Sequence, residues 1–364
     1  MKNTLKLTAA MTLLAGTAFA AGLDRSGQST TFIFEEGNAI QMGYSSVSPD
    51  VTGVFAHPLY GDLDSGSASD DYSDMSFAGK IDSATGKYSF AVIYDQPFGA
   101  NTNYPVDGFT QGLNATFESK GLSFIGKVKA TDRISLFAGA TSSRISAELN
   151  KPSSAYSVIS NEDDSHGWLI GAAYEIPEYA LRVDATYRSA VEHKGVKISE
   201  SIVHPLAGPM TFDDTIDVTM PQSFNLNVQT GINDKTLVFA GLRWVEWTAF
   251  DITTPVGGEL VSYENDTISY NVGVGRKITD NFSILGSIGY EASTDEVPSL
   301  LSPTNGRMSY NLGAQYKIGN TKIAAGYSYV NLGDGTGVVV ADPLTADFKD
   351  NTATGFGIKL TQSF

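Results

Sequence analysis

The chain has 364 residues, no cysteine, 41% hydrophobic residues and a formal net charge of −16. The acidic balance argues against a nucleic-acid partner, which needs a basic surface. The lack of cysteine excludes disulfide bonds as the source of stability in an exported protein. No stretch holds the run of about 20 apolar residues that a transmembrane helix requires.

The first twenty residues have the features of a secretory signal peptide. Lys2 and Lys6 supply a positive start, residues 7–14 form a short apolar run, and Ala18-Phe19-Ala20 is a small-x-small cleavage site. We expect cleavage after Ala20, so that residues 1–20 take no part in the fold. The alternative is a buried N-terminal helix.

Residues 21–39 do not have the pattern of a strand. Phe32, Ile33 and Phe34 form a compact apolar cluster with polar residues on both sides. We predict an N-terminal hatch or plug segment that lies inside a barrel. The alternative is a disordered leader, since chain termini are often loose.

From residue 40 to residue 364, predicted strands are joined alternately by short turns and long polar loops. The short turns are rich in residues that favour turn backbones and lie at 82–87, 130–133, 176–179, 233–235, 279–281 and 319–321. The long loops lie near 58–73, 98–108, 150–165, 199–215, 250–265, 294–305 and 333–352. These thirteen connections predict an all-β fold: a transmembrane antiparallel β-barrel of about 14 strands with both termini on the periplasmic side.

The clearest predicted strand is Ala180–Glu192. Its odd positions are mostly apolar, and its even positions include Arg182, Asp184 and Arg188. Successive strand side chains point to opposite faces, so one face would meet lipid and the other would line the lumen. A charged lumen can hold a plug, guide a ligand head group or simply be hydrated, and the pattern leaves all three open.

The same alternation recurs to the C-terminus. It is found in 268–275, 310–318, 322–329 and 356–361, with Tyr or Phe near several strand ends, as in an interfacial aromatic girdle. The chain ends in Phe364, which resembles the final aromatic residue of barrels assembled into the bacterial outer membrane.

No catalytic or metal site is predicted. The four histidines lack zinc-site spacing, and neither HExxH nor GxSxG occurs. The acidic stretch of Asp62, Asp64, Asp70, Asp71 and Asp74 departs from the EF-hand pattern and is expected to be a solvated loop. We therefore predict neither an enzyme nor a cofactor, although a Ser/His/acid set assembled from distant residues stays open.

Several stretches in the right order resemble the FadL-type outer-membrane transporters of long-chain fatty acids and other hydrophobic compounds. They are Ser48-Pro49-Asp50-Val51-Thr52-Gly53, Asp184-Ala-Thr-Tyr187-Arg188-Ser189, Val218-Thr-Met-Pro221-Gln-Ser-Phe224, Arg243-Trp244-Val-Glu-Trp247-Thr-Ala-Phe250 and Pro298 through Tyr316. The resemblance implies a fourteen-stranded barrel with an internal hatch, capture of an apolar ligand outside, and passage after the hatch shifts. The chain departs from the family in its short hatch, which has no Asn-Pro-Ala motif.

The leading hypothesis is passive transport of long-chain fatty acids or similar hydrophobic molecules across the bacterial cell outer membrane. The predicted ligand-binding residues are Phe32, Ile33, Phe34 and Arg188. The expected partners are outer-membrane lipid and lipopolysaccharide, a hydrophobic small-molecule ligand and, during biogenesis, the barrel-assembly machinery. The alternatives are a general porin and a structural or adhesive surface barrel with acidic cation-binding loops.

Overall fold

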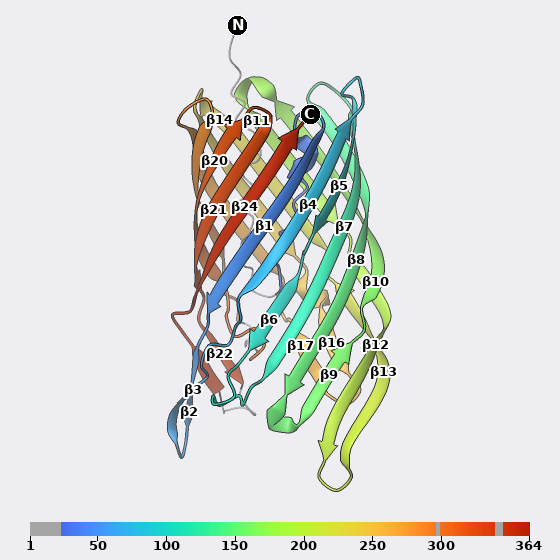
Figure 1. Cartoon of the computed structure of the whole chain (residues 1–364), viewed down its shortest axis with the longest axis vertical. Coiled ribbons are helices and arrows are strands. Elements are labelled where there is room, and N and C mark those ends of the chain that lie inside the picture. The colour runs from blue at the N-terminus through green and yellow to red at the C-terminus, as the bar shows by residue number, and fades with distance from the viewer. Residues whose placement is uncertain (1–22, 296–298, 339–344) are drawn as a thin grey trace.

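The computed structural model describes residues 23–295, 299–338 and 345–364, so the predicted signal peptide lies outside the described residues. Fourteen antiparallel strands close into one barrel, because β1 pairs with β4 on one side and with β24 on the other (Figure 1). These strands are β1 (Ala39–Asp50), β4 (Tyr72–Asp82), β5 (Tyr88–Asp95), β7 (Asn114–Lys129), β8 (Ile134–Lys151), β10 (Asp163–Ile176), β11 (Leu181–Arg188), β14 (Ser223–Asn233), β15 (Thr236–Val245), β18 (Thr267–Lys277), β19 (Phe282–Glu291), β20 (Arg307–Ile318), β21 (Thr321–Leu332) and β24 (Thr352–Ser363).

The wall is apolar outside and polar inside, which confirms the predicted membrane barrel. On β11, the side chains of Arg182, Asp184 and Arg188 are buried. On β18, the large apolar side chains at even positions, Tyr270 and Val272 among them, are exposed. This arrangement suits a barrel whose outer surface meets lipid, since a soluble protein would bury the apolar face.

One predicted strand is interrupted in the structure. The stretch Ala180–Glu192 divides into β11 and a separate strand, β12 (Val191–His204). At the break, the Ser189 hydroxyl accepts the Trp168 N–H at 3.0 Å in place of a ladder carbonyl. Beyond it the side chains change faces, and Val191 becomes buried. β11 pairs directly with β14, so β12 leaves the wall.

The two ends of the barrel differ. Short turns and the C-terminus lie at one end, and long loops with strands of their own lie at the other (Figure 1). Long loops face outward in outer-membrane barrels, so we call this the outer end. Its strands are β2 (Gly53–His57), β3 (Gly61–Asp64), β6 (Gly99–Asn103), β9 (Tyr156–Ser160), β12, β13 (Gly208–Met220), β16 (Asp251–Thr254), β17 (Gly258–Ser262), β22 (Gly335–Val338) and β23 (Thr345–Phe348).

The described helical segments are short turns of 3-10 helix. They are η2 (Thr31–Phe34), η3 (Pro152–Ser154), η4 (Pro177–Tyr179) and η5 (Trp247–Ala249). In the described part of the chain, none of the helices has the length and apolar character needed to cross a membrane.

Candidate functional site

The N-terminal segment, residues 23–38, lies inside the barrel. It starts beside the β5–β6 junction, where the Leu23 carbonyl accepts the Gly99 N–H at 2.7 Å and the Arg25 N–H donates to the Pro97 carbonyl at 2.9 Å. Further along, the Thr30 hydroxyl is 2.9 Å from that of Thr186 on the inner face of β11. The segment therefore runs down the lumen against the inward-facing polar side chains.

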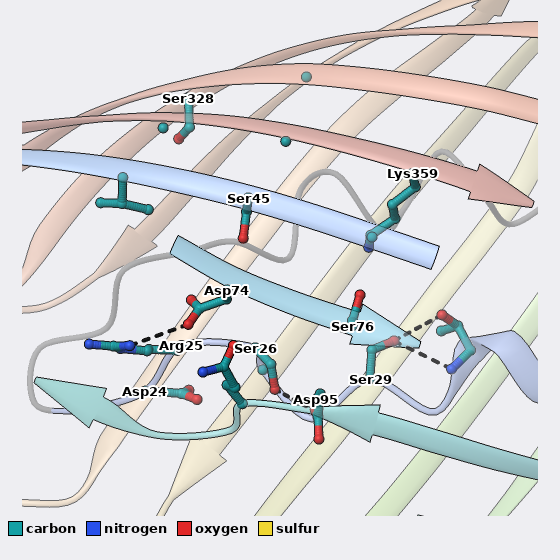
Figure 2. Close-up of a pocket in the computed structure, with 18 of the residues that line it drawn as sticks. Asp24, Arg25, Ser26, Ser29, Ser45, Asp74, Ser76, Asp95, Ser328 and Lys359 are labelled. Carbon is teal, nitrogen blue, oxygen red and sulfur yellow. Dashed lines mark hydrogen bonds and ion pairs between the residues drawn. The ribbon is translucent and has the colours of Figure 1, made fainter. Parts of the chain in front are cut away.

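Ion pairs join this segment to three parts of the wall. Asp24 pairs with Arg243 of β15, whose Nη2 lies 3.0 Å from Oδ1. Arg25 donates to Asp74 of β4 at 3.2 Å (Figure 2). Near the other end, Lys322 of β21 donates to Glu35 at 2.6 Å, and both side chains are buried. Breaking a buried ion pair leaves one charge without a partner and away from water, which is costly. These contacts therefore hold the segment in one position.

The predicted residues Phe32, Ile33 and Phe34 lie in η2, near the short-turn end. Phe32 and Ile33 are buried in an apolar cluster with wall residues that include Phe137. The Phe34 ring meets Phe137 edge-on, with 5.8 Å between ring centres, and Arg182 stacks over it at 4.7 Å. The structure thus places this cluster between the segment and the wall.

Arg188, the fourth predicted ligand residue, is buried at the outer end of β11. Its guanidinium donates to the Ser123 hydroxyl at 3.1 Å and to the Gln28 carbonyl at 3.3 Å. It contacts the N-terminal segment through this carbonyl. This contact, at Gln28, lies several residues before Phe32 in the segment, so Arg188 is not part of the aromatic cluster of η2.

A cavity of about 220 Å³ occupies the lumen beside the segment, and we call it the polar cavity because charged side chains of both segment and wall line it together with apolar ones. Figure 2 shows Arg25 and Ser26 of the segment on one side, with Ser45, Ser328 and Lys359 of the wall on the other. Five serines and five glycines are among the wall residues that line it, and their small side chains leave space that water can fill.

A second cavity, of about 80 Å³, lies nearer the outer end and is mainly apolar. Leu23 forms part of its lining, whereas the next residue, Asp24, lines the polar cavity. The side chains around it come from both wall and outer loops, and include Phe117, Ile145, Val196, Ile216, Val218, Phe250, Val261 and Tyr263. Among the described residues that line it there is no Lys or Arg, and Glu148 is the charged member of the lining. The first residues of the segment therefore separate an apolar cavity from a polar one.

Arg307 of β20 lines the polar cavity and has spare hydrogen-bonding capacity. Its side chain is buried, and its Nη2 lies 3.3 Å from Glu291. Its Nη1 is also buried and has no hydrogen-bond partner among the described residues. A buried donor without a partner is costly, so an anionic oxygen at this position would be stabilised.

The β16–β17 hairpin covers the apolar cavity and is held by one carboxylate. Glu200 of β12 is fully buried; it accepts the Tyr156 hydroxyl at 2.7 Å and the Gly257 N–H at 2.9 Å. Burial acts to raise the pKa of Glu200, but hydrogen bonds from Thr254, Tyr156 and two backbone amides outweigh it and lower that pKa. Burial also raises the pKa of Tyr156, to about 12, so its hydroxyl stays a donor.

Acid is expected to loosen this hairpin. A carboxyl whose folded-state pKa is lowered stabilises the fold fully above its unfolded-state pKa, near 4.5, and loses that effect as the pH falls through the lower folded value. The protection factor of the amides in residues 251–262, which is exchange corrected for its intrinsic pH dependence, should therefore fall below pH 4.5 by about tenfold, and Glu200→Gln should remove this fall. The exposed Glu259→Gln on the same hairpin is the control, and an identical acid response in Glu200→Gln would contradict the assignment.

A Ser–His–Asp chain of hydrogen bonds also occurs among the described residues. His193 Nδ1 lies 2.7 Å from Asp163, and its Nε2 lies 3.2 Å from the Ser143 hydroxyl. Ser143 is buried and lines neither of the two cavities. These contacts join β12 to β8 and β10, which keeps the outer loops above the apolar cavity. In the described residues, no group of three His, Cys, Asp or Glu side chains could hold a metal ion.

Sequence reasoning missed the apolar cavity. Trp247 and Phe250 belong to a stretch that was singled out by resemblance alone, and both are buried in the cluster beneath the outer loops. Trp247 begins η5 and Phe250 follows its last residue, and this spacing carries no signal of what they pack against. Arg307 belongs to another stretch noted for its resemblance, Pro298 through Tyr316, but the resemblance assigned no role to its side chain.

The sequence and the fold were both compared with those of known proteins. The profile of the family described as "Outer membrane protein transport protein (OMPP1/FadL/TodX)" matches residues 9–364. The fold is similar to a FadL homologue of Pseudomonas aeruginosa, with TM-score 0.75, 17% identity and 92% of each chain covered. It is similar to the Pseudomonas putida toluene transporter TodX, with TM-score 0.67, 14% identity and coverage of 92% of this chain and 91% of that one.

The Ralstonia pickettii toluene transporter TbuX is a further structural neighbour, with TM-score 0.65, 14% identity and coverage of 100% of this chain and 99% of that one. No curated protein matches the sequence. The family profile spans nearly the whole chain. The chain therefore belongs to the OMPP1/FadL/TodX family, whose members are outer-membrane channels for hydrophobic compounds and not enzymes.

Proposed function

We propose that this channel carries long-chain fatty acids or similar amphipathic molecules passively across the outer membrane. The observation that supports this proposal is the pair of cavities on either side of Leu23 and Asp24. An apolar cavity without Lys or Arg suits a hydrocarbon chain, and a neighbouring lumen with several arginines suits a carboxylate. Transport down a gradient needs no energy source.

The N-terminal segment is proposed to act as the hatch. The apolar cavity of about 80 Å³ is smaller than the roughly 150 Å³ that holds a benzene molecule in another protein, so a ligand must displace side chains. Leu23 is the lining residue that belongs to the segment. Its displacement would act on the adjacent Asp24–Arg243 pair, and release of that pair would let the segment move. Phe32, Ile33, Phe34 and Arg188 then line the later part of the path.

Arg307 is proposed to receive the ligand carboxylate through its unpartnered Nη1. Replacing it with Gln together with Glu291→Gln removes both charges of the pair and so avoids a stranded carboxylate. We expect this double variant to bind oleate about tenfold to a hundredfold more weakly, since a hydrogen bond to a charged group is worth about 1.5–3 kcal/mol. Binding of an uncharged hydrocarbon such as toluene should be unchanged.

The measurement is displacement of a fluorescent long-chain fatty acid from the purified, folded barrel. Saturable binding that oleate displaces would support fatty acids as ligands. Displacement by toluene but not by oleate would instead assign the cavity to uncharged hydrocarbons. Equal loss of oleate and toluene binding in the double variant would contradict the role of Arg307.

A general porin is the second candidate, and the polar cavity beside the segment favours it. A porin predicts steady ion conductance from the purified protein in a planar bilayer, whereas a lumen closed by residues 23–38 predicts very little. Strong conductance without any ligand would replace the hatch proposal with the porin.

A further inference from the structure

Four loops at the outer end share one sequence pattern, a proline followed by an aliphatic residue, any residue and a glycine. The four copies are Pro58-Leu59-Tyr60-Gly61, Pro105-Val106-Asp107-Gly108, Pro205-Leu206-Ala207-Gly208 and Pro255-Val256-Gly257-Gly258. Three of them form the tips of the β2–β3, β12–β13 and β16–β17 hairpins, which we call the proline tips. The wall and the two cavities do not account for this repetition.

The proline tips share a backbone geometry. In each, the glycine that resumes the strand has positive φ: +76° at Gly61, +78° at Gly208 and +70° at Gly258. Proline restricts φ at the start of the turn, and glycine adopts positive φ without strain. The three turns are therefore held in one shape before any partner binds.

A side chain before each proline completes the turn. The His57 Nδ1 accepts the Leu59 N–H at 3.1 Å, and the His204 Nδ1 accepts the Leu206 N–H at 3.2 Å. In the third tip the Thr254 hydroxyl accepts the Gly257 N–H at 3.0 Å. The first two tips are thus completed by a side chain of their own hairpin, and their leucines face outward, whereas in the third tip the Val256 and Gly257 N–H groups also donate to Glu200 of β12.

Two of the tips present an unusually exposed leucine. Leu206 is 94% exposed and Leu59 83%, the two highest values for large apolar side chains in the described chain, whereas Val256 of the third tip is 38% exposed. Single exposed leucines are ordinary on protein surfaces, but a rigid turn that repeatedly presents one is not explained by folding. In Figure 1 the β2–β3 and β12–β13 tips extend furthest from the end that carries the C-terminus.

The charges of the hairpins restrict the partner. None of the three contains Lys or Arg over residues 53–64, 201–212 or 251–262, and the first and third carry Asp or Glu. An anionic surface would find no cation to pair with and would be repelled by the carboxylates. An uncharged apolar surface would bury the leucines without that repulsion.

We propose that Leu59 and Leu206 insert into an electrically neutral oil–water surface, such as a hydrocarbon droplet coated with zwitterionic lipid, and so dock the outer end on the phase that holds the substrate. This inference rests on the proposed function only in naming that phase as the source of ligand. The pre-formed turns favour docking because little conformational entropy is lost on insertion.

Docking is tested with the full mature chain in nanodiscs and hexadecane droplets coated with phosphatidylcholine, by flotation without any added ligand. Wild-type nanodiscs should float with the droplets, and empty nanodiscs should not. Leu59→Asp with Leu206→Asp should weaken flotation by at least about tenfold, and the two alanine replacements should weaken it less but measurably. Tyr179→Asp with Ile232→Asp adds the same charge to exposed apolar positions at the other end and should leave flotation unchanged.

Flotation of the double aspartate variant at the wild-type level would overturn the proposal. So would a loss in the aspartate variant with none in the alanine variant, because charge alone would then explain it. Uptake of fatty acid supplied in solution separates the two claims. The wild type and the double aspartate variant should take up the dissolved fatty acid equally. A wild-type chain that floats with the droplets but takes up no fatty acid would contradict the proposed function while supporting docking.

Discussion

Replacing Phe32 and Phe34 together by Asp is expected to abolish uptake of hydrophobic ligand while the barrel still assembles. Phe32 is 3% exposed and packs in an apolar cluster, where a carboxylate costs several kcal/mol. The segment would leave its position, and the apolar path would be lost. Uptake of a labelled fatty acid by cells, together with the heat-dependent gel mobility of the folded barrel, measures both effects.

The single variants should differ, which makes the test sharper. The Phe34 ring lies beside two cations, with Lys127 at 4.9 Å and Arg182 at 4.7 Å from its centre, so an aspartate there would gain partners. Phe32→Asp should therefore carry most of the loss and Phe34→Asp little of it. Replacing both by Leu keeps the apolar character and serves as the control. Normal uptake in the double aspartate variant would remove these residues from the path.

Ala147→Phe is expected to eliminate saturable ligand binding without preventing assembly. Ala147 of β8 lines the apolar cavity, and its N–H is already satisfied by the Ser160 hydroxyl at 2.8 Å. The added ring is benzene-sized and would more than fill the cavity of about 80 Å³, so no space would remain into which a ligand could enter. Affinity for a fluorescent fatty acid should fall by more than about a hundredfold.

The matched control is Ala138→Phe on the same strand. Ala138 belongs to the opposite, lipid-facing set of β8 side chains and is exposed. The same substitution there should leave affinity unchanged, because the ring enters lipid. If both variants bind the ligand as the wild type does, the apolar cavity is not the binding site.

The sequence by itself determined the barrel, and the reason is periodicity. Side chains of a strand alternate between two faces. The positions of Arg182 and Asp184 on the inner face could therefore be predicted without knowing the neighbouring strands. The alternation of short turns and long loops fixed the number of strands as well. The prediction erred at Ser189, where a side-chain hydroxyl accepts the Trp168 N–H and the two faces exchange, because a single serine within an alternating pattern does not indicate a break.

The tertiary structure alone decided where a ligand could bind. The apolar cavity joins residues as distant as Leu23, Phe117 and Val261, and no local pattern connects them. The apolar cluster Phe32 to Phe34 was visible in the sequence, but its contacts with the wall were not. Spacing within a strand is a local property that the sequence carries directly. A cavity is made by strands that meet only when the barrel closes, so its position depends on register and loop packing.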